Sequence, residues 1–288
     1  MLAGRPAGVT AADGFALAAT EYAPVGRARA AVVVNSATAV RRRYYDRFAL
    51  YLAAHGFAVL TYDYRGVGDS APARLRGFSA AMRQWGELDQ SAMLAHAARW
   101  QPDVPLFVIG HSVGGQIVGL LPDPSPIRRV LVVAAQHNYW RLWGAPQRYT
   151  LWALWHLLMP GASHVLGYFP GSRFGLGEDL PRDVALEWAR WCRSPGALVE
   201  AVGGDAAERF ARYAGPLLAL SFDDDTWFAP RPAVEALLRL YPSASAEHRH
   251  IAARSLGVDR VGHFGFFRDL ARERGWPIAL EWLGRGLT

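Results

Sequence analysis

The chain has 288 residues, of which 51% are hydrophobic, so it is long enough for one large α/β domain or two small ones. Its formal net charge of +6 rests on arginine alone, and because these arginines are scattered and accompany no nucleic-acid-binding motif, no binding to nucleic acid is expected. The single cysteine excludes an internal disulfide, residues 1–20 lack the apolar core of a signal peptide, and no apolar stretch is long enough to cross a membrane, which together predict a cytoplasmic protein.

The first half of the chain alternates between strand and helix patterns. Asp13-Gly14 is a hairpin signal between two short strands within residues 9–22. Continuous apolar runs predict buried strands at residues 30–34, 57–62, 106–109 and 129–135. Helical spacing of apolar residues is found over 41–55 and 79–100. This alternation predicts an α/β fold with a mostly parallel sheet and helices on both faces.

The alternation stops between residues 136 and 214. This segment carries six tryptophans and has helical patterns at 151–158 and 183–193, and it is too long for a loop. We interpret 136–214 as a helical, tryptophan-rich cap, and residues 1–135 with 215–288 as the core. The tryptophans either form the core of the cap or line an acyl pocket, for which Trp152 and Trp155 are candidates.

After the cap, the strand and helix patterns resume. Strands are expected at 217–222 and 248–253, and a helix at 232–241 between them. Residues 262–265 form a glycine-rich loop, which an aromatic helix from Phe266 is expected to follow, and residues 277–283 come last. The chain thus predicts a single sheet that is interrupted once by the cap.

The most informative stretch is Gly110-His111-Ser112-Val113-Gly114, which lies between a buried strand and a second apolar run. The spacing G-x-S-x-G is typical of a nucleophile elbow, a sharp strand-to-helix turn that presents the serine to substrate. Small residues are needed beside the serine because such a turn crowds its neighbours. The N–H of Val113 is a candidate oxyanion donor at the start of the helix. The alternative is a glycine-rich turn with an exposed, non-catalytic serine.

A nucleophilic serine needs a histidine base and a carboxylate that orients this base. Asp225 lies just past the predicted strand 217–222, and His263 lies in a loop after the last predicted strand. We therefore predict Ser112, Asp225 and His263 as the catalytic residues. Their order along the chain, serine then acid then histidine, is that of α/β-hydrolases.

These motifs make the chain resemble the α/β-hydrolase superfamily over essentially its whole length. Within it, residues 221–227 (SFDDDTW) and 261–268 (VGHFGFFR) are similar to a bacterial group of predicted, uncharacterised hydrolases. Two departures from the usual acid loop, Phe222 in place of glycine and a proline one step late at Pro230, leave Asp224 as an alternative acid.

The resemblance also implies a second oxyanion donor in the loop after strand 30–34. The family usually has His-Gly there, whereas this chain has Asn35-Ser36. The expected donor is then the N–H of Ala37, with Ser36 as the alternative. A backbone donor does not depend on its own side chain, so the substitution is compatible with the role.

Several other polar residues receive structural interpretations. His111, next to the nucleophile in sequence, is expected to be a packed turn residue. Asp63, Arg65 and Asp69 are expected to fix turns. Cys192 is interpreted as a core residue. The remaining cap histidines lack metal-ligand spacing, so no metal site is predicted.

The sequence thus predicts a cofactor-free serine esterase of carboxylesterase type that acts on a small acyl substrate. A thioesterase, a peptidase or an acyltransferase would share the same triad, and a non-catalytic binding module of this fold would usually lack one of its members. Peripheral contact of the tryptophan- and arginine-rich cap with lipid stays open as a second property. The natural substrate and the oligomeric state are not predicted.

Overall fold

A single large sheet organises the computed structural model, which describes residues 3–287. Within that range the sheet has eight strands in the order β1-β2-β4-β3-β5-β6-β9-β10. The strands are β1 (Arg5–Thr10), β2 (Ala16–Tyr22), β3 (Ala30–Asn35), β4 (Phe57–Tyr62), β5 (Leu106–His111), β6 (Ile127–Val133), β9 (Pro216–Phe222) and β10 (Ser245–Ile251). β2 pairs antiparallel with both β1 and β4, and all other neighbours are parallel. The predicted α/β class with a mostly parallel sheet is confirmed, and residues 1, 2 and 288 of the predicted core lie outside the described residues.

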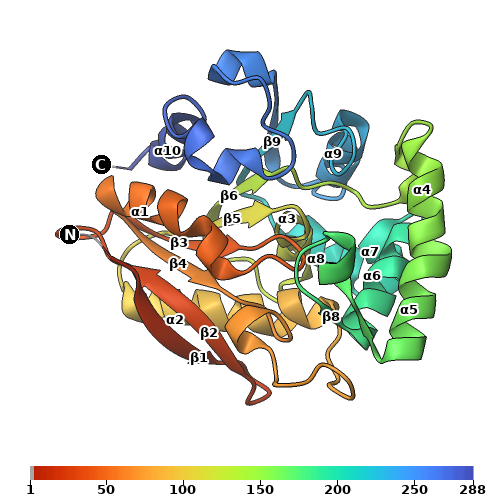
Figure 1. Ribbon diagram of the computed structural model, residues 1–288. Coiled ribbons are helices and arrows are strands. Elements are labelled where there is room, and N and C mark those ends of the chain that lie inside the picture. Colours follow the sequence, from red (N-terminus) through yellow and green to blue (C-terminus); the bar gives the residue numbers. More distant parts are fainter. Residues whose placement is uncertain (1–2, 288) are drawn as a thin grey trace.

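Helices cover both faces of this sheet. Figure 1 shows α1 and α10 on one face and α2 on the other. The helices of the core are α1 (Asp46–Ala54), α2 (Ser91–Trp100), α3 (Val113–Gln116), α9 (Arg231–Leu238) and α10 (Trp276–Gly284). Because both faces are covered, every residue of β3, β4 and β5 is buried, which explains why these strands are continuous apolar runs.

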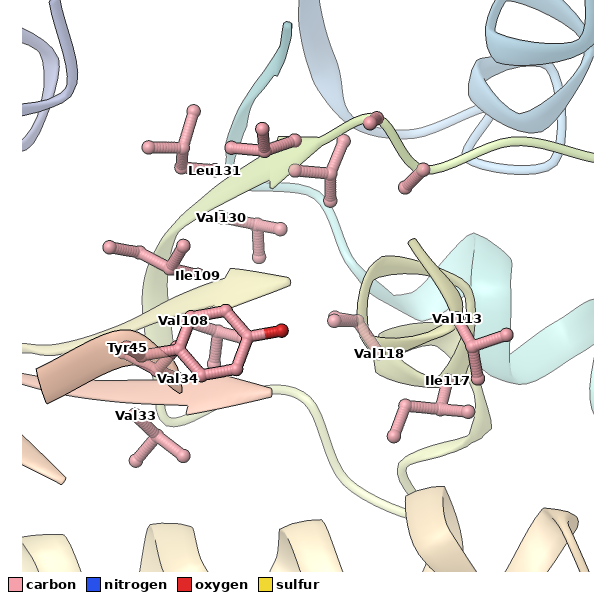
Figure 2. Packing of buried hydrophobic residues seen from close by; sticks show 14 of the residues in the cluster. Val33, Val34, Tyr45, Val108, Ile109, Val113, Ile117, Val118, Val130 and Leu131 are labelled. Carbon is pink, nitrogen blue, oxygen red and sulfur yellow. The ribbon is translucent and has the colours of Figure 1, made fainter. Parts of the chain in front are cut away.

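The core around β5 holds the elbow in place. Figure 2 shows buried apolar side chains of β3, β5 and β6 beside the short helix that follows the elbow. Val108 and Ile109 of β5 and Ile117 beyond α3 are fully buried. Since a close-packed interior tolerates little displacement, the residue between β5 and α3 has a fixed position.

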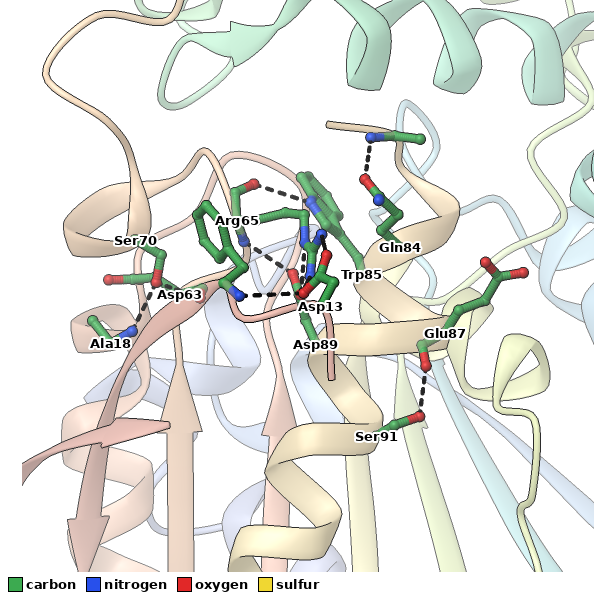
Figure 3. A network of polar contacts seen from close by, with 12 residues as sticks. Asp13, Ala18, Asp63, Arg65, Ser70, Gln84, Trp85, Glu87, Asp89 and Ser91 are labelled. Atoms are coloured by element: carbon green, nitrogen blue, oxygen red, sulfur yellow. Dashed lines mark hydrogen bonds and ion pairs between the residues drawn. The ribbon is translucent and has the colours of Figure 1, made fainter. Parts of the chain in front are cut away.

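A polar network fixes the loop after β4. The Arg65 side chain donates to Asp89 Oδ1 at 2.7 Å and to Asp13 Oδ2 at 2.6 Å. The Asp63 carboxylate accepts the N–H of Asp69 at 3.0 Å. Figure 3 shows Asp13, Asp63, Arg65 and Asp89 beside the helix that leads into α2. The charges of this loop therefore serve the fold, as the sequence analysis expected.

Residues 134–215, which contain the predicted cap, contribute no strand to the large sheet within the described part of the chain. Their elements are α4 (Gln147–Ala153), α5 (Met159–Leu166), α6 (Arg182–Arg193), α7 (Ala197–Val202), α8 (Ala206–Arg212) and a small hairpin of β7 (Tyr168–Phe169) and β8 (Leu180–Pro181). A π-helical turn over 154–158 joins α4 to α5, and in Figure 1 the two form one long helix at the side of the molecule. No helix within residues 3–287 combines the length and the apolar character that a membrane span requires.

One predicted helix is wrong. The residues from Phe266 form only short 3₁₀ turns at 265–267 and 269–271, and the last helix begins at Trp276. Phe266 and Phe267 are buried, and both rings pack edge-on against Phe48 of α1, at 5.8 and 5.3 Å between centroids. Two consecutive rings that both enter the core do not fit one face of a helix, so tertiary packing overrides the local pattern.

Candidate active site

Ser112 occupies the sharp turn between β5 and α3. Its backbone has φ 54° and ψ −122°, a conformation that non-glycine residues rarely adopt. Its N–H donates to the Val133 carbonyl of β6 at 3.0 Å, which helps to hold the turn. A Cβ at Gly114 would lie 2.3 Å from the Asn35 carbonyl oxygen, and one at Gly110 would lie 2.5 Å from the Cα of Gly115. The two glycines of the motif are therefore required by the close approach of backbone to backbone.

The structure brings His263 and Asp225 into direct contact. Asp225 Oδ2 lies 2.7 Å from His263 Nδ1, and both side chains are almost completely buried. The other oxygen of Asp225 accepts the N–H of Phe228 at 3.2 Å, which fixes the carboxylate. Since the carboxylate accepts from Nδ1, that nitrogen carries the proton and Nε2 is left as the basic nitrogen. His263 and Ser112 line the same cavity, although no hydrogen bond joins them within the described residues.

The three consecutive aspartates after β9 contact three different segments. Asp224 accepts the N–H groups of Val261 and Gly262 at 2.8 and 2.9 Å, and so holds the loop that carries His263. Asp223 accepts the N–H of Ala253 at 2.9 Å. Of the two acids that the sequence left open, Asp225 is the one in contact with the histidine.

Two of the predicted oxyanion donors differ in their surroundings. The N–H of Val113 has no protein acceptor within residues 3–287, as expected for the first residue of a helix. The N–H of Ala37, by contrast, donates to the Tyr45 hydroxyl at 2.8 Å. Ala37 lines the cavity, but its amide is not the free donor that the sequence analysis expected, because serving an oxyanion would require it to share or leave Tyr45. Nothing around Ala37 in the sequence indicates this partner, because Tyr45 lies eight residues later, in a 3₁₀ turn before α1.

His111 lies in the core behind the site. Its Nδ1 is 2.8 Å from the Tyr45 hydroxyl, and its Nε2 is 2.9 Å from the backbone carbonyl of His263. Burial lowers the pKa of His111 well below its ordinary value, so the ring is neutral. The structure thus agrees with the interpretation of His111 as a packed residue, and adds that it contacts the loop of His263.

Ser112 and His263 open into a cavity of about 400 Å³ between the core and residues 136–192. Most of its wall is apolar, with Trp143, Trp155 and Trp188 as the largest side chains. Trp155 and Trp188 pack edge-on at 4.8 Å. Trp152 is 41% exposed and does not line the cavity, so its selection as a pocket residue is wrong. On a helix, Trp152 and Trp155 are three positions apart, yet only Trp155 faces the core.

Comparisons with known proteins agree with this fold. A family model described as "Serine aminopeptidase, S33" matches residues 26–164, just under half of the chain. Among solved structures, a thermostable carboxyl esterase from Bacillus coagulans has a TM-score of 0.65 at 14% identity and covers all of both chains. The esterase Pf2001 from Pyrococcus furiosus has a TM-score of 0.62 at 15% identity, covering 100% of this chain and 94% of its own. The chain shares the fold of these esterases.

A further solved structure has a similar fold but gives no evidence about the reaction of this chain. DcsB, in complex with a substrate analogue, has a TM-score of 0.67 at 13% identity and covers 99% of this chain and 100% of its own. No curated protein sequence matches the chain. Likeness at these identities establishes the fold, so the chemistry of this chain has to be argued from its own residues.

Sequence reasoning missed the polar residues of the cavity wall. Thr38, Gln136 and Asn138 line the cavity beside its tryptophans. Gln136 and Asn138 follow β6, the neighbour of β5, so their place at the carboxyl edge of the sheet was the only signal in the sequence. No group of three or more metal-binding side chains was found in the described part of the chain.

Proposed function

We propose that this protein is an α/β-hydrolase, and a serine hydrolase of carboxylesterase type, with Ser112, His263 and Asp225 as its catalytic residues. The observation that carries the proposal is the 2.7 Å contact between Asp225 and His263 in the cavity that Ser112 also lines. A buried carboxylate on Nδ1 fixes the tautomer in which Nε2 accepts a proton. The strained elbow supports the same role, because backbone strain of this kind collects at functional sites.

In the proposed mechanism, Ser112 Oγ attacks the acyl carbonyl carbon while His263 Nε2 takes its proton. The oxyanion that forms is stabilised by the N–H of Val113 and by a donor of the 36–37 loop. The imidazolium then gives its proton to the leaving alkoxide, which departs as the alcohol and leaves an acyl-serine. Water, deprotonated by the same nitrogen, attacks the acyl-serine, and the imidazolium returns this proton to Ser112 Oγ as the bond to the acyl carbon breaks and the carboxylic acid leaves. Asp225 keeps the imidazole oriented and stabilises its positive charge throughout.

The cavity wall favours a neutral ester over a peptide amine. No aspartate or glutamate within residues 3–287 lines the cavity, whereas an aminopeptidase needs a partner for the positive charge of the substrate's amino terminus. Arg268 at the wall would repel such a charge. The tryptophans instead offer apolar surface to an acyl chain. The aminopeptidase description of the matching family model is therefore not extended to this chain.

The proposal is tested with an activated ester, p-nitrophenyl butyrate, and with a fluorophosphonate probe that labels activated serines. We expect wild-type protein to turn over the ester and to be labelled at Ser112. Ser112→Ala should lose both, with a drop in rate of about 10⁴ or more, while circular dichroism and melting temperature stay unchanged. A folded Ser112→Ala protein that retains turnover would contradict the mechanism, and unlabelled wild-type protein would favour a non-catalytic binding module.

A further inference from the structure

Asn138 has an unusual position for an amide side chain. It follows β6, lines the cavity, and is only 3% exposed. Neither its Nδ2 nor its Oδ1 has a hydrogen-bond partner within the described residues. Gln136, two residues earlier, also lines the cavity and has a buried Oε1 without a partner. Two residues that line the cavity therefore carry three buried polar atoms without a partner.

Such atoms are costly to bury. A buried donor or acceptor without a partner costs about 1–3 kcal/mol, and native proteins leave few of them. The polar neighbour of Asn138 is the thiol of Cys192, which also lines the cavity. Burial raises the pKa of this thiol well above its ordinary value, so it stays neutral, and a neutral thiol is a weak hydrogen-bond partner. This weak contact leaves hydrogen-bonding capacity of the amide unused next to the cavity, and a substrate group reaches it when the Asn138 side chain turns toward the cavity.

We propose that Asn138 is a specificity-determining residue, and that its carboxamide binds a neutral hydroxyl or amide group of the substrate. This inference rests on the proposed function, because it assigns the substrate class of the same cavity. An amide presents one donor and one acceptor side by side, which a hydroxyl or another amide can satisfy together. A carboxylate can use only the donor, and a plain alkyl chain can use neither. The preferred substrate is thus an ester with a hydroxyl or amide group in the part that fills the cavity.

The chemistry of the wall supports a substrate group at this place. Trp155, Trp188 and Leu154 surround the cavity with apolar surface, on which an alkyl chain binds without direction. Asn138 and Gln136 are the neutral polar groups that follow β6 within this surface. A site built to bind a polar substrate group rejects the analogue that lacks the group, because its own polar atoms then stay unpaired. The alternative is that the two amides hold a water molecule. A comparison of matched esters distinguishes a bound substrate group from bound water.

The test compares matched esters. The first set is methyl hexanoate, its derivatives with a hydroxyl on the third, fifth or sixth carbon, and methyl adipamate, which ends in a carboxamide. The second set is ethyl hexanoate and 2-hydroxyethyl hexanoate, which move the hydroxyl to the alcohol side. kcat/KM is measured for wild-type protein, and Kd is measured by calorimetry on Ser112→Ala, which binds without turnover. We expect one polar derivative to exceed its plain parent by about tenfold or more in both measurements.

Asn138→Leu removes both polar atoms at similar volume, and should bring the preferred and plain esters to within about threefold of each other. Asn138→Ala provides the same comparison if the leucine variant is unstable. Ser163→Ala is the matched control. Ser163 is also buried and its Oγ has no partner, but the residue does not line the cavity. The substitution should therefore leave the preference for the polar ester intact.

The outcomes separate the two proposals. Absence of turnover and of labelling refutes the esterase, while the Kd ratio on Ser112→Ala still decides the role of Asn138. If no polar derivative is preferred by more than about threefold, or if Asn138→Leu leaves the preference unchanged, Asn138 binds only water and the inference is wrong.

Discussion

The His111 imidazole hydrogen-bonds the backbone carbonyl oxygen of His263 at 2.9 Å, and so links the residue before the proposed nucleophile to the proposed base. Because a carbonyl only accepts, Nε2 of His111 carries the proton and its Nδ1 accepts from the Tyr45 hydroxyl. The same hydroxyl accepts the N–H of Ala37. One chain of hydrogen bonds therefore connects the loop after β3, the elbow and the loop of His263, and changes in any of its members should affect the others.

Tyr45→Phe tests this chain. The substitution leaves Nδ1 of His111 and the N–H of Ala37 without a partner in the core, so the free energy of unfolding should fall by about 1–3 kcal/mol. If Ala37 serves the oxyanion by leaving Tyr45, ester turnover should persist in the folded variant. Urea denaturation and kcat measure the two effects. Tyr149→Phe is the control, because that tyrosine is exposed, and an equal loss of stability in both variants would contradict the role of the chain.

Changing Asp225 to asparagine should mainly lower kcat, and changing Asp224 to asparagine should mainly lower stability. Asp225→Asn can no longer fix the tautomer of His263, and kcat should fall by up to about 10⁴. Asp224→Asn weakens the acceptor for the N–H groups of Val261 and Gly262, so it should lower the free energy of unfolding by about 1–3 kcal/mol and reduce kcat far less. Kinetics and denaturation of both variants distinguish these results. If Asp224→Asn loses most of its kcat while Asp225→Asn keeps nearly all of it, the two roles are reversed.

The strands of the sheet and the turn at Ser112 could be predicted from local sequence patterns. The strands are continuous apolar runs because both sheet faces are covered, and the G-x-S-x-G spacing reflects contacts within a few residues of Ser112. The contact between Asp225 and His263 was expected from chain order and from the resemblance to a known superfamily. Each of these features depends on nearby residues or on a recurrent motif, which a sequence displays directly.

The remaining features depend on contacts between distant segments. The acceptor of the Ala37 N–H belongs to Tyr45 in the adjoining turn, and nothing in the pattern around Ala37 indicates it. The same holds for Trp152 and Trp155, which look alike in sequence and differ only in the direction that the cap helix gives them. The turns at Phe266 and Phe267 replace the expected helix because their rings enter the core against α1.

We expect the folded protein to lose stability in mild acid because of His137. Its ring is buried, and burial, with a smaller contribution from the positive charge of Arg239, lowers its pKa to about 4. The unfolded chain binds a proton at this histidine near its ordinary pKa of about 6.5, while the folded chain does not, so protonation favours unfolding as the pH falls from 6.5 toward 4. The free energy of unfolding should therefore decrease with a slope of up to about 1.4 kcal/mol per pH unit from this residue.

Urea denaturation at pH 7, 6 and 5 measures the slope. His137→Gln should flatten it, whereas His111, whose pKa burial lowers in the same direction, should keep part of the dependence in that variant. His55→Gln is the control, because the His55 side chain is exposed and its removal should leave the slope as it is. Identical slopes in wild type and His137→Gln would show that His137 does not titrate differently on folding.

The last prediction concerns the length of the acyl chain. Trp155 lines the cavity, is almost fully buried, and packs edge-on against Trp188, so it offers apolar surface to a chain that extends from Ser112. Each buried methylene contributes about 0.8 kcal/mol, or about fourfold in kcat/KM, until the cavity is filled. For p-nitrophenyl esters we expect kcat/KM to rise from acetate to medium chains, and Trp155→Leu to blunt the rise. Trp152→Leu should leave the profile unchanged, because Trp152 lies at the surface of the same helix. If acetate is the best substrate and neither variant alters the profile, the cavity tryptophans pack the cap and do not select the acyl chain.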